Sequence, residues 1–265
     1  MPHPARLRAA LQVKVAITDL AGKVLDRFLL DDLRPEVCIE SDDLRYHDRD
    51  FSRRVGNAFY FKRLPVTVHA PFLRIDAGST DGPTRNHARQ TLERALRLAE
   101  YFRPVTIVCH AGPRRDLEHG ELADWIERAM PTFAWMHRAC ADMGAVLALE
   151  NIRHQYPALL LPCFEELEGA RWCFDLGHMN VFSSVPALEW VRVLGPHLGQ
   201  LHLHDNFGDS DRHLPAGHGN IDYRTLLAAL GGLPAPLAAT AEVHHGHEFS
   251  ASVEYLAPMW PWETD

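Results

Sequence analysis

No apolar run in this sequence approaches the roughly 18 residues that a membrane-spanning helix needs. The first residues, MPHPARLRAALQ, also lack an apolar core long enough for a secretory signal. The five cysteines are odd in number and include no C-x-x-C pair, which indicates reduced, mostly buried thiols. These absences predict a cytoplasmic protein that has no membrane partner.

The sequence also lacks an excess of basic residues. Its net charge of −8 argues against a broad polyanion-binding surface, although it leaves room for a local basic groove. The apolar fraction of 46% is enough for a large core, and a length of 265 residues is typical of a (β/α)8 barrel. Histidine is unusually frequent, with 17 residues, which fits either a site rich in imidazoles or a solvated scatter.

Short apolar runs alternate with longer stretches of helical period along the whole chain. Eight runs are typical of strands, and they cover residues 11–17, 36–40, 66–70, 105–110, 145–150, 171–175, 198–205 and 237–243. Strict alternation of this kind is the pattern of a parallel sheet covered by helices. Eight units close more readily as a barrel than as an open sheet, so we expect a single α/β domain over residues 1–265, a (β/α)8 TIM barrel.

Side chains that bind metals recur at the carboxyl ends of six successive predicted strands. They are His69, His110, Glu150, Asp175, His178, His202, Asp211, His213 and Glu242. In a parallel barrel these strand ends meet at one face, where the βα loops form the active site. A single histidine or a D-x-x-H pattern at a strand end is common by chance. Glu150 and Glu242 are stronger signals, because a buried glutamate is rare unless it is paired.

Taken together, six consecutive strand ends that each offer a histidine or a carboxylate indicate a metal site. A divalent ion of the zinc or manganese type takes about four to six ligands, so nine residues with one bridging carboxylate fit two or three ions. Without metal, four clustered carboxylates would repel one another and bind protons instead. We therefore expect one to three zinc or manganese ions per chain.

At these residues the sequence resembles the xylose isomerase-like TIM-barrel superfamily, which includes sugar isomerases and epimerases and the DNA-repair enzyme endonuclease IV. The resemblance covers nearly the whole chain and rests on HAPFLRIDAGSTD, IVCHAG, LALENI, CFDLGHMN, LHLHDN, DRHLPAGHGNID and AEVHH. It implies three ion positions, with Glu150 as a bridge between two of them: His69, His110 and Glu150; Glu150, Asp175, His202 and Glu242; and His178, Asp211 and His213.

Two activities are compatible with this resemblance. The epimerase branch implies one ion on Glu150, Asp175, His202 and Glu242, with Glu150 and Glu242 as catalytic residues that move protons. The full set of nine implies instead an endonuclease IV-like phosphoester hydrolase of the abasic-site type. The segment between Glu150 and Asp175 is shorter than in that endonuclease and lacks its glycine-rich, DNA-contacting loop. The sequence thus slightly favours an isomerase or epimerase of a small sugar or sugar phosphate over a DNA enzyme.

Three further residues are candidates for substrate binding. His204 shares an inward face with His202, where it either touches substrate or hydrogen-bonds to a metal ligand. Phe72 lies where, by resemblance, the repair enzyme inserts an aromatic ring into its duplex. Arg114 follows His110 and could hold a phosphate. The sequence carries no signal for the oligomeric state.

Overall fold

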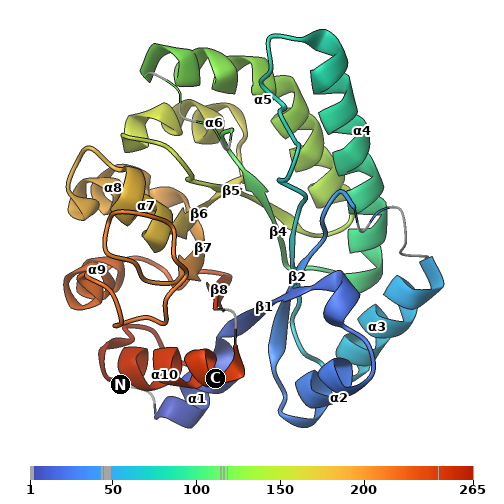
Figure 1. The fold of residues 1–265 in the computed structure, drawn as a ribbon, viewed down its shortest axis with the longest axis vertical. Helices are drawn as coiled ribbons and strands as arrows, with labels where there is room; N and C mark the ends of the chain where they lie inside the picture. Colours follow the sequence, from blue (N-terminus) through green and yellow to red (C-terminus); the bar gives the residue numbers. More distant parts are fainter. Residues whose placement is uncertain are drawn as a thin grey trace.

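Eight parallel strands close into a barrel in chain order, which confirms the predicted (β/α)8 TIM barrel (Figure 1). The computed structural model describes residues 3–42, 44, 49–113, 115, 117, 119–243 and 245–264. Every predicted apolar run overlaps one strand. The strands are β1 (Gln12–Ala16), β2 (Arg34–Cys38), β3 (Thr67–His69), β4 (Thr106–His110), β5 (Val146–Glu150), β6 (Arg171–Asp175), β7 (Leu198–Leu203) and β8 (Ala238–Ala241).

Helices surround the barrel on its outside (Figure 1). They are α1 (Pro4–Ala10), α2 (Lys23–Leu30), α3 (Arg49–Phe61), α4 (Gly82–Ala99), α5 (His119–Asp142), α6 (Leu161–Glu166), α7 (Leu176–Phe182), α8 (Ala187–Leu194), α9 (Tyr223–Leu230) and α10 (Gly246–Leu256). Periodicity does not predict α1 or α7, which are both short. Among the described residues, none of the helices combines the length and hydrophobicity that a membrane span requires.

The apolar core lies mainly between the strands and the helices, whereas the inside of the barrel is largely polar, with a small apolar cluster of Val108, Ala148 and Cys173. Barrels of this type are usually filled by branched aliphatic side chains. Here a buried polar layer occupies the interior, formed by Gln12, Glu36, Thr67, Gln200 and Thr240. Its members bond to one another: the Thr67 hydroxyl donates to Gln12 at 2.7 Å and the Thr240 hydroxyl donates to Glu36 at 2.8 Å.

This polar layer lies directly beneath the carboxyl ends of the strands. Side chains two positions apart on a strand point to the same face. Thr67 therefore precedes His69 on the inner face of β3, Gln200 precedes His202 on β7, and Thr240 precedes Glu242 after β8. The predicted ligands therefore lie directly above a layer of polar side chains that are hydrogen-bonded to one another.

Candidate metal centre

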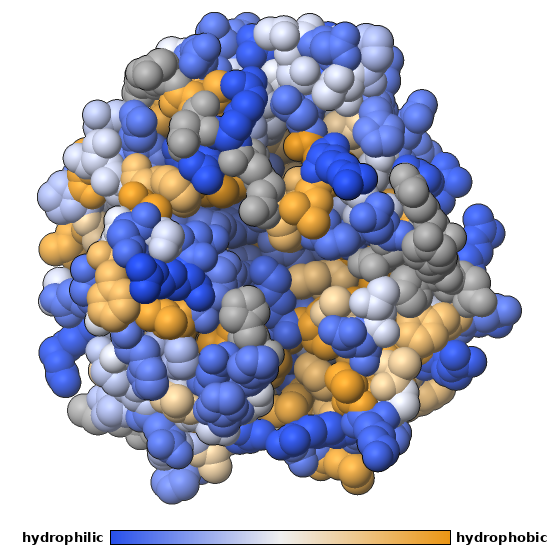
Figure 2. All heavy atoms as spheres, in the orientation of Figure 1, coloured by the Kyte–Doolittle hydropathy of each residue, from blue (hydrophilic) through white to orange (hydrophobic). Residues whose placement is uncertain are grey.

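The nine predicted ligands meet at the carboxyl ends of the strands. Ion-pair contacts of 3.0 to 3.4 Å link all nine side chains into one network. Figure 2 shows a face of the molecule that is hollowed near its middle, with hydrophilic side chains in the hollow. Convergence of six strand ends on one place is what the sequence pattern predicts, and the structure brings the whole set together.

The first group of ligands is centred on Glu150, which ends β5. One of its oxygens, Oε2, lies 3.1 Å from Nε2 of His69 and 3.4 Å from Nε2 of His110. The other, Oε1, lies 3.5 Å from Nδ1 of His202, which belongs to the second group. Because its two oxygens face different histidines, Glu150 has the geometry of a bridging carboxylate.

The second group surrounds His202 on β7. Its Nδ1 atom lies 3.0 Å from Oε1 of Glu242, 3.5 Å from Oε1 of Glu150 and 3.7 Å from Oδ2 of Asp175. All four side chains are buried. One imidazole nitrogen thus faces three carboxylates, a donor set that suits a divalent cation of the zinc or manganese type.

The third group lies nearer to solvent, at the loop between β7 and α9. Oδ2 of Asp211 lies 3.3 Å from Nε2 of His178 and 3.3 Å from Nε2 of His213. His178 is brought here because Asp175 ends β6 and caps α7, accepting a hydrogen bond of 2.7 Å from the His178 backbone N–H. His213 has a φ of 51°, a left-handed conformation that is uncommon outside glycine.

Backbone carbonyl groups orient three of the histidines. Nδ1 of His69 lies 2.9 Å from the carbonyl of Ala70, and Nδ1 of His178 lies 3.1 Å from the carbonyl of Asn151. Nδ1 of His213 lies 3.1 Å from the carbonyl of Glu242. Donation from Nδ1 to a carbonyl leaves Nε2 with its lone pair directed at the site, as in metal-binding histidines.

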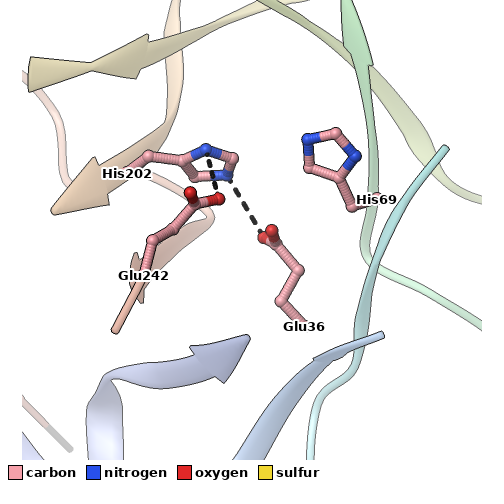
Figure 3. Close-up of side chains that lie close together, drawn as sticks. All are labelled: Glu36, His69, His202 and Glu242. Atoms are coloured by element: carbon pink, nitrogen blue, oxygen red, sulfur yellow. Dashed lines mark ion pairs between the residues drawn. The ribbon is translucent and has the colours of Figure 1, made fainter. Parts of the chain in front are cut away.

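Glu36 on β2 joins the site although sequence reasoning missed it (Figure 3). Its Oε2 atom lies 3.3 Å from Nε2 of His202, on the opposite side of the imidazole from the carboxylates of the second group. The same oxygen accepts hydrogen bonds from Thr67 at 3.2 Å, from Thr240 at 2.8 Å and from Gln200. Glu36 thereby holds His202 so that Nδ1 faces the ligands.

Lys14 on β1 is the second residue that sequence reasoning missed. Its Nζ atom donates a hydrogen bond of 3.0 Å to Oε2 of Glu242. The only warning in the sequence is a charged residue inside the apolar run LQVKVAI, where both faces of a barrel strand are expected to be buried.

Burial and charge set the pKa values of these groups in opposite directions. Burial disfavours ionisation of Glu150, but His110 and His202 outweigh it and hold the pKa of Glu150 well below its usual range. Burial also opposes ionisation of Glu242, and Lys14 and His202 again lower its pKa well below that range. Burial lowers the pKa of His110 well below its usual value, although the Glu150 carboxylate acts in the opposite direction.

The unpaired atoms of the network test whether a metal ion fits here. Among the described residues, Nδ1 of His202 and Oε1 of Glu242 make no hydrogen bond of good geometry, although both are buried. Buried polar atoms without partners are rare and costly in proteins. A cation between these atoms would satisfy both, and it would also neutralise the clustered carboxylates. The residues therefore fit divalent ions in their kind. Groups close enough to hold an ion include His69, His110 and Glu150; Glu150, Asp175 and His178; and His204, His213 and Glu242.

The three predicted substrate-binding residues have different surroundings. His204 is fully buried, stacks on His213 with ring centroids 4.0 Å apart, and places Nε2 3.0 Å from Oδ1 of Asp175, so it contacts ligands. Phe72 stacks on His110 at 4.5 Å and borders the site. Arg114 lies outside the described residues.

Comparison with known sequences also identifies a TIM barrel. The chain belongs to the xylose isomerase-like TIM barrel family, whose model matches residues 36–259. An uncharacterised protein of Methanocaldococcus jannaschii is 26% identical over 177 residues, which cover 63% of this chain and 60% of that relative. A probable endonuclease 4 of Mycobacterium leprae is 24% identical over 194 residues, which cover 68% of this chain and 74% of that protein.

Solved structures of similar fold include a D-tagatose 3-epimerase-like protein, with a TM-score of 0.78 and 20% identity over 94% of this chain and 97% of that chain. A Thermus thermophilus protein soaked with ZnCl2 has a TM-score of 0.81 and 24% identity over the same shares of the two chains. At these identities the likeness establishes the fold alone, because this architecture supports many chemistries.

Proposed function

We propose that this protein is a metal-dependent phosphoester hydrolase. The observation that carries the proposal is the third ligand group, in which His178 and His213 each lie 3.3 Å from Asp211. A single-ion epimerase needs only the second group. A third group of candidate ligands beside the other two is unexplained by one-ion chemistry, whereas clustered ions suit the displacement of a phosphoester oxygen.

The charge balance of the site supports an anionic substrate. Four carboxylate ligands and Glu36 carry five negative charges, and Lys14 contributes one positive charge. Three divalent ions would leave the site with a net charge of about +2, whereas a single ion would leave about −2. A phosphate ester would bind to the first of these sites and be repelled by the second. The overall net charge of −8 favours a small phosphate ester over a duplex.

The chain's own residues have distinct tasks in this reaction. Bound divalent ions supply Lewis acidity and lower the pKa of water. Glu150 orients the histidines of the first group, and Glu36 orients His202. Oε2 of Glu242 accepts a hydrogen bond from Lys14, and Oε1 lies 3.0 Å from Nδ1 of His202, where a bound ion would engage it. A carboxylate held in this way is suited to binding and poorly suited to shuttling a proton.

A second candidate function is isomerisation or epimerisation of a small sugar or sugar phosphate. One observation favours it: Glu150 and Glu242 both face Nδ1 of His202, at 3.5 and 3.0 Å, so two carboxylates border one position. Two glutamates beside a substrate carbon could remove and return a proton. The epimerase-like fold neighbours are consistent with this alternative without favouring it.

Parallel assays of hydrolysis and of proton exchange distinguish the two candidates. Protein loaded with zinc or manganese would be incubated with a chromogenic phosphomonoester, a chromogenic phosphodiester and, at low salt, a duplex with one abasic site. The same protein would be incubated with a ketose panel in heavy water. We expect phosphoester cleavage that is lost in His213→Ala. Deuterium uptake into a ketose without any cleavage would instead establish the isomerase or epimerase.

A further inference from the structure

Strand β1 supplies the site with a positively charged side chain, Lys14, which none of the predicted ligand groups contains. The parallel register pairs Lys14 with Glu36 on β2, and it pairs Val13 with Ala241 on β8. The next position beyond Ala241 is Glu242, so Lys14 stands between two acidic residues at the same level of the barrel. Lys14 precedes the residues matched by the family model, which begin at position 36.

In the ion pair between Lys14 and Glu242, the lysine is the more solvent-exposed partner. The Lys14 side chain is 26% exposed, whereas the Glu242 side chain is 2% exposed. An ammonium has three N–H donors. Among the described residues, Glu242 is its hydrogen-bonding partner, and the ring of Phe72 lies 5.9 Å from Nζ. Two of its three donors are therefore left without a hydrogen-bonding partner among the described residues.

A simple counter-ion role does not explain this arrangement. Glu242 already faces two imidazoles, His202 at 3.0 Å and His213 at 3.4 Å. If divalent ions occupied the ligand groups, Glu242 would be neutralised without Lys14. The partly buried Lys14 would then be a surplus positive charge, which is costly unless an anion accompanies it.

We propose that Lys14 binds a phosphate oxygen of the substrate, acting as a specificity-determining residue for anionic substrates. The inference rests on the proposed function for its substrate class. Phe72 packs on His110 and places its ring 5.9 Å from Nζ of Lys14, so one side of this position is apolar. Partial exclusion of water strengthens the attraction between an ammonium and a phosphate.

Binding of inorganic phosphate to metal-loaded protein, measured by calorimetry after unbound metal has been removed, tests the proposal without turnover. Lys14→Met should weaken phosphate binding by roughly tenfold or more, because a hydrogen bond to a charged group is lost. Lys14→Arg should restore much of the affinity. Lys62→Met is the matched control, since Lys62 pairs with Asp32 on the surface, and it should leave phosphate affinity unchanged.

Metal content, measured on every variant, separates substrate binding from support of Glu242. Lys14→Gln keeps a donor for Glu242 but removes the charge, so it covers the case in which Lys14→Met loses metal. Unchanged phosphate affinity in a metal-replete Lys14 variant would overturn the proposal. Loss of metal in both uncharged variants would also overturn it, because Lys14 would then serve the ligands. Lys14-dependent phosphate binding without any hydrolysis would contradict the proposed hydrolase and leave this inference standing.

Discussion

Replacing Glu36 by glutamine should weaken metal binding although Glu36 belongs to none of the predicted ligand groups. Oε2 of Glu36 lies 3.3 Å from Nε2 of His202, and it is fully buried. Glutamine preserves the size of the side chain and can still accept from Thr67 and Thr240. It replaces a charged acceptor by a neutral one, so His202 loses the partner that directs Nδ1 toward the ligands.

The expected size of this effect follows from the kind of contact that is lost. Hydrogen bonds to charged groups contribute about 1.5–3 kcal/mol, compared with about 0.5–1.5 kcal/mol for neutral pairs. Partners that orient metal-binding histidines typically change metal affinity by about 10- to 100-fold. We therefore expect Glu36→Gln to weaken the tightest-bound ion by about tenfold or more, while the fold is retained.

Competition with a chelator of known affinity measures this change directly. Glu93→Gln is the matched control, because it is the same substitution at a glutamate outside the site. Glu93 lies on α4 and pairs with Arg97 at the surface. The unfolding temperature of the metal-free proteins would show whether the fold is intact. Equal metal affinity in Glu36→Gln and in Glu93→Gln would refute the positioning role of Glu36.

Two further changes test the surroundings of the site. The Asn151 side chain bonds to Trp172 Nε1 and to the backbone N–H and carbonyl of Asp175 at 2.9–3.0 Å. Asn151→Leu leaves these buried groups unpaired, so it should destabilise the metal-free protein by about 3 kcal/mol or more in chemical denaturation. Wild-type stability would contradict this. Burial lowers the pKa of His154 from 6.5 to about 4, so the folded state binds fewer protons than the unfolded state between these values. Stability should therefore fall by up to about 3 kcal/mol as the pH drops from 6.5 to 4, and His154→Gln should show a smaller loss in denaturation curves across that range.

The convergence of the nine candidate ligands could be predicted from the sequence because they all follow strands of one parallel barrel. Each apolar run ends where its strand reaches the face of the barrel that carries the βα loops. A polar residue at that point therefore lies at this face. His69, His110 and Glu150 are the last residues of their strands, and Asp175 also ends its strand. The carboxyl ends of eight strands form a ring, and the pattern needs no knowledge of distant contacts.

Lys14 and Glu36 could not be found in this way, because neither lies at the end of its run. Each is a charged residue within a strand, and its partner is remote in sequence. Lys14 bonds to a residue 228 positions away, and the contact exists only because β1 closes the barrel against β8. The polar interior that supports Glu36 likewise depends on closure. His204 was open between two roles, and its position against Asp175 became visible only in three dimensions.

Metal stoichiometry tests the multinuclear centre most directly. Protein purified without chelator would be analysed by elemental mass spectrometry, alongside His213→Ala and the control His218→Ala, an exposed histidine of the same loop. We expect about three zinc or manganese ions per chain, about one fewer in His213→Ala and no change in His218→Ala. About one ion per chain, unaffected by His213→Ala, would contradict the multinuclear centre and leave the second ligand group as the working site.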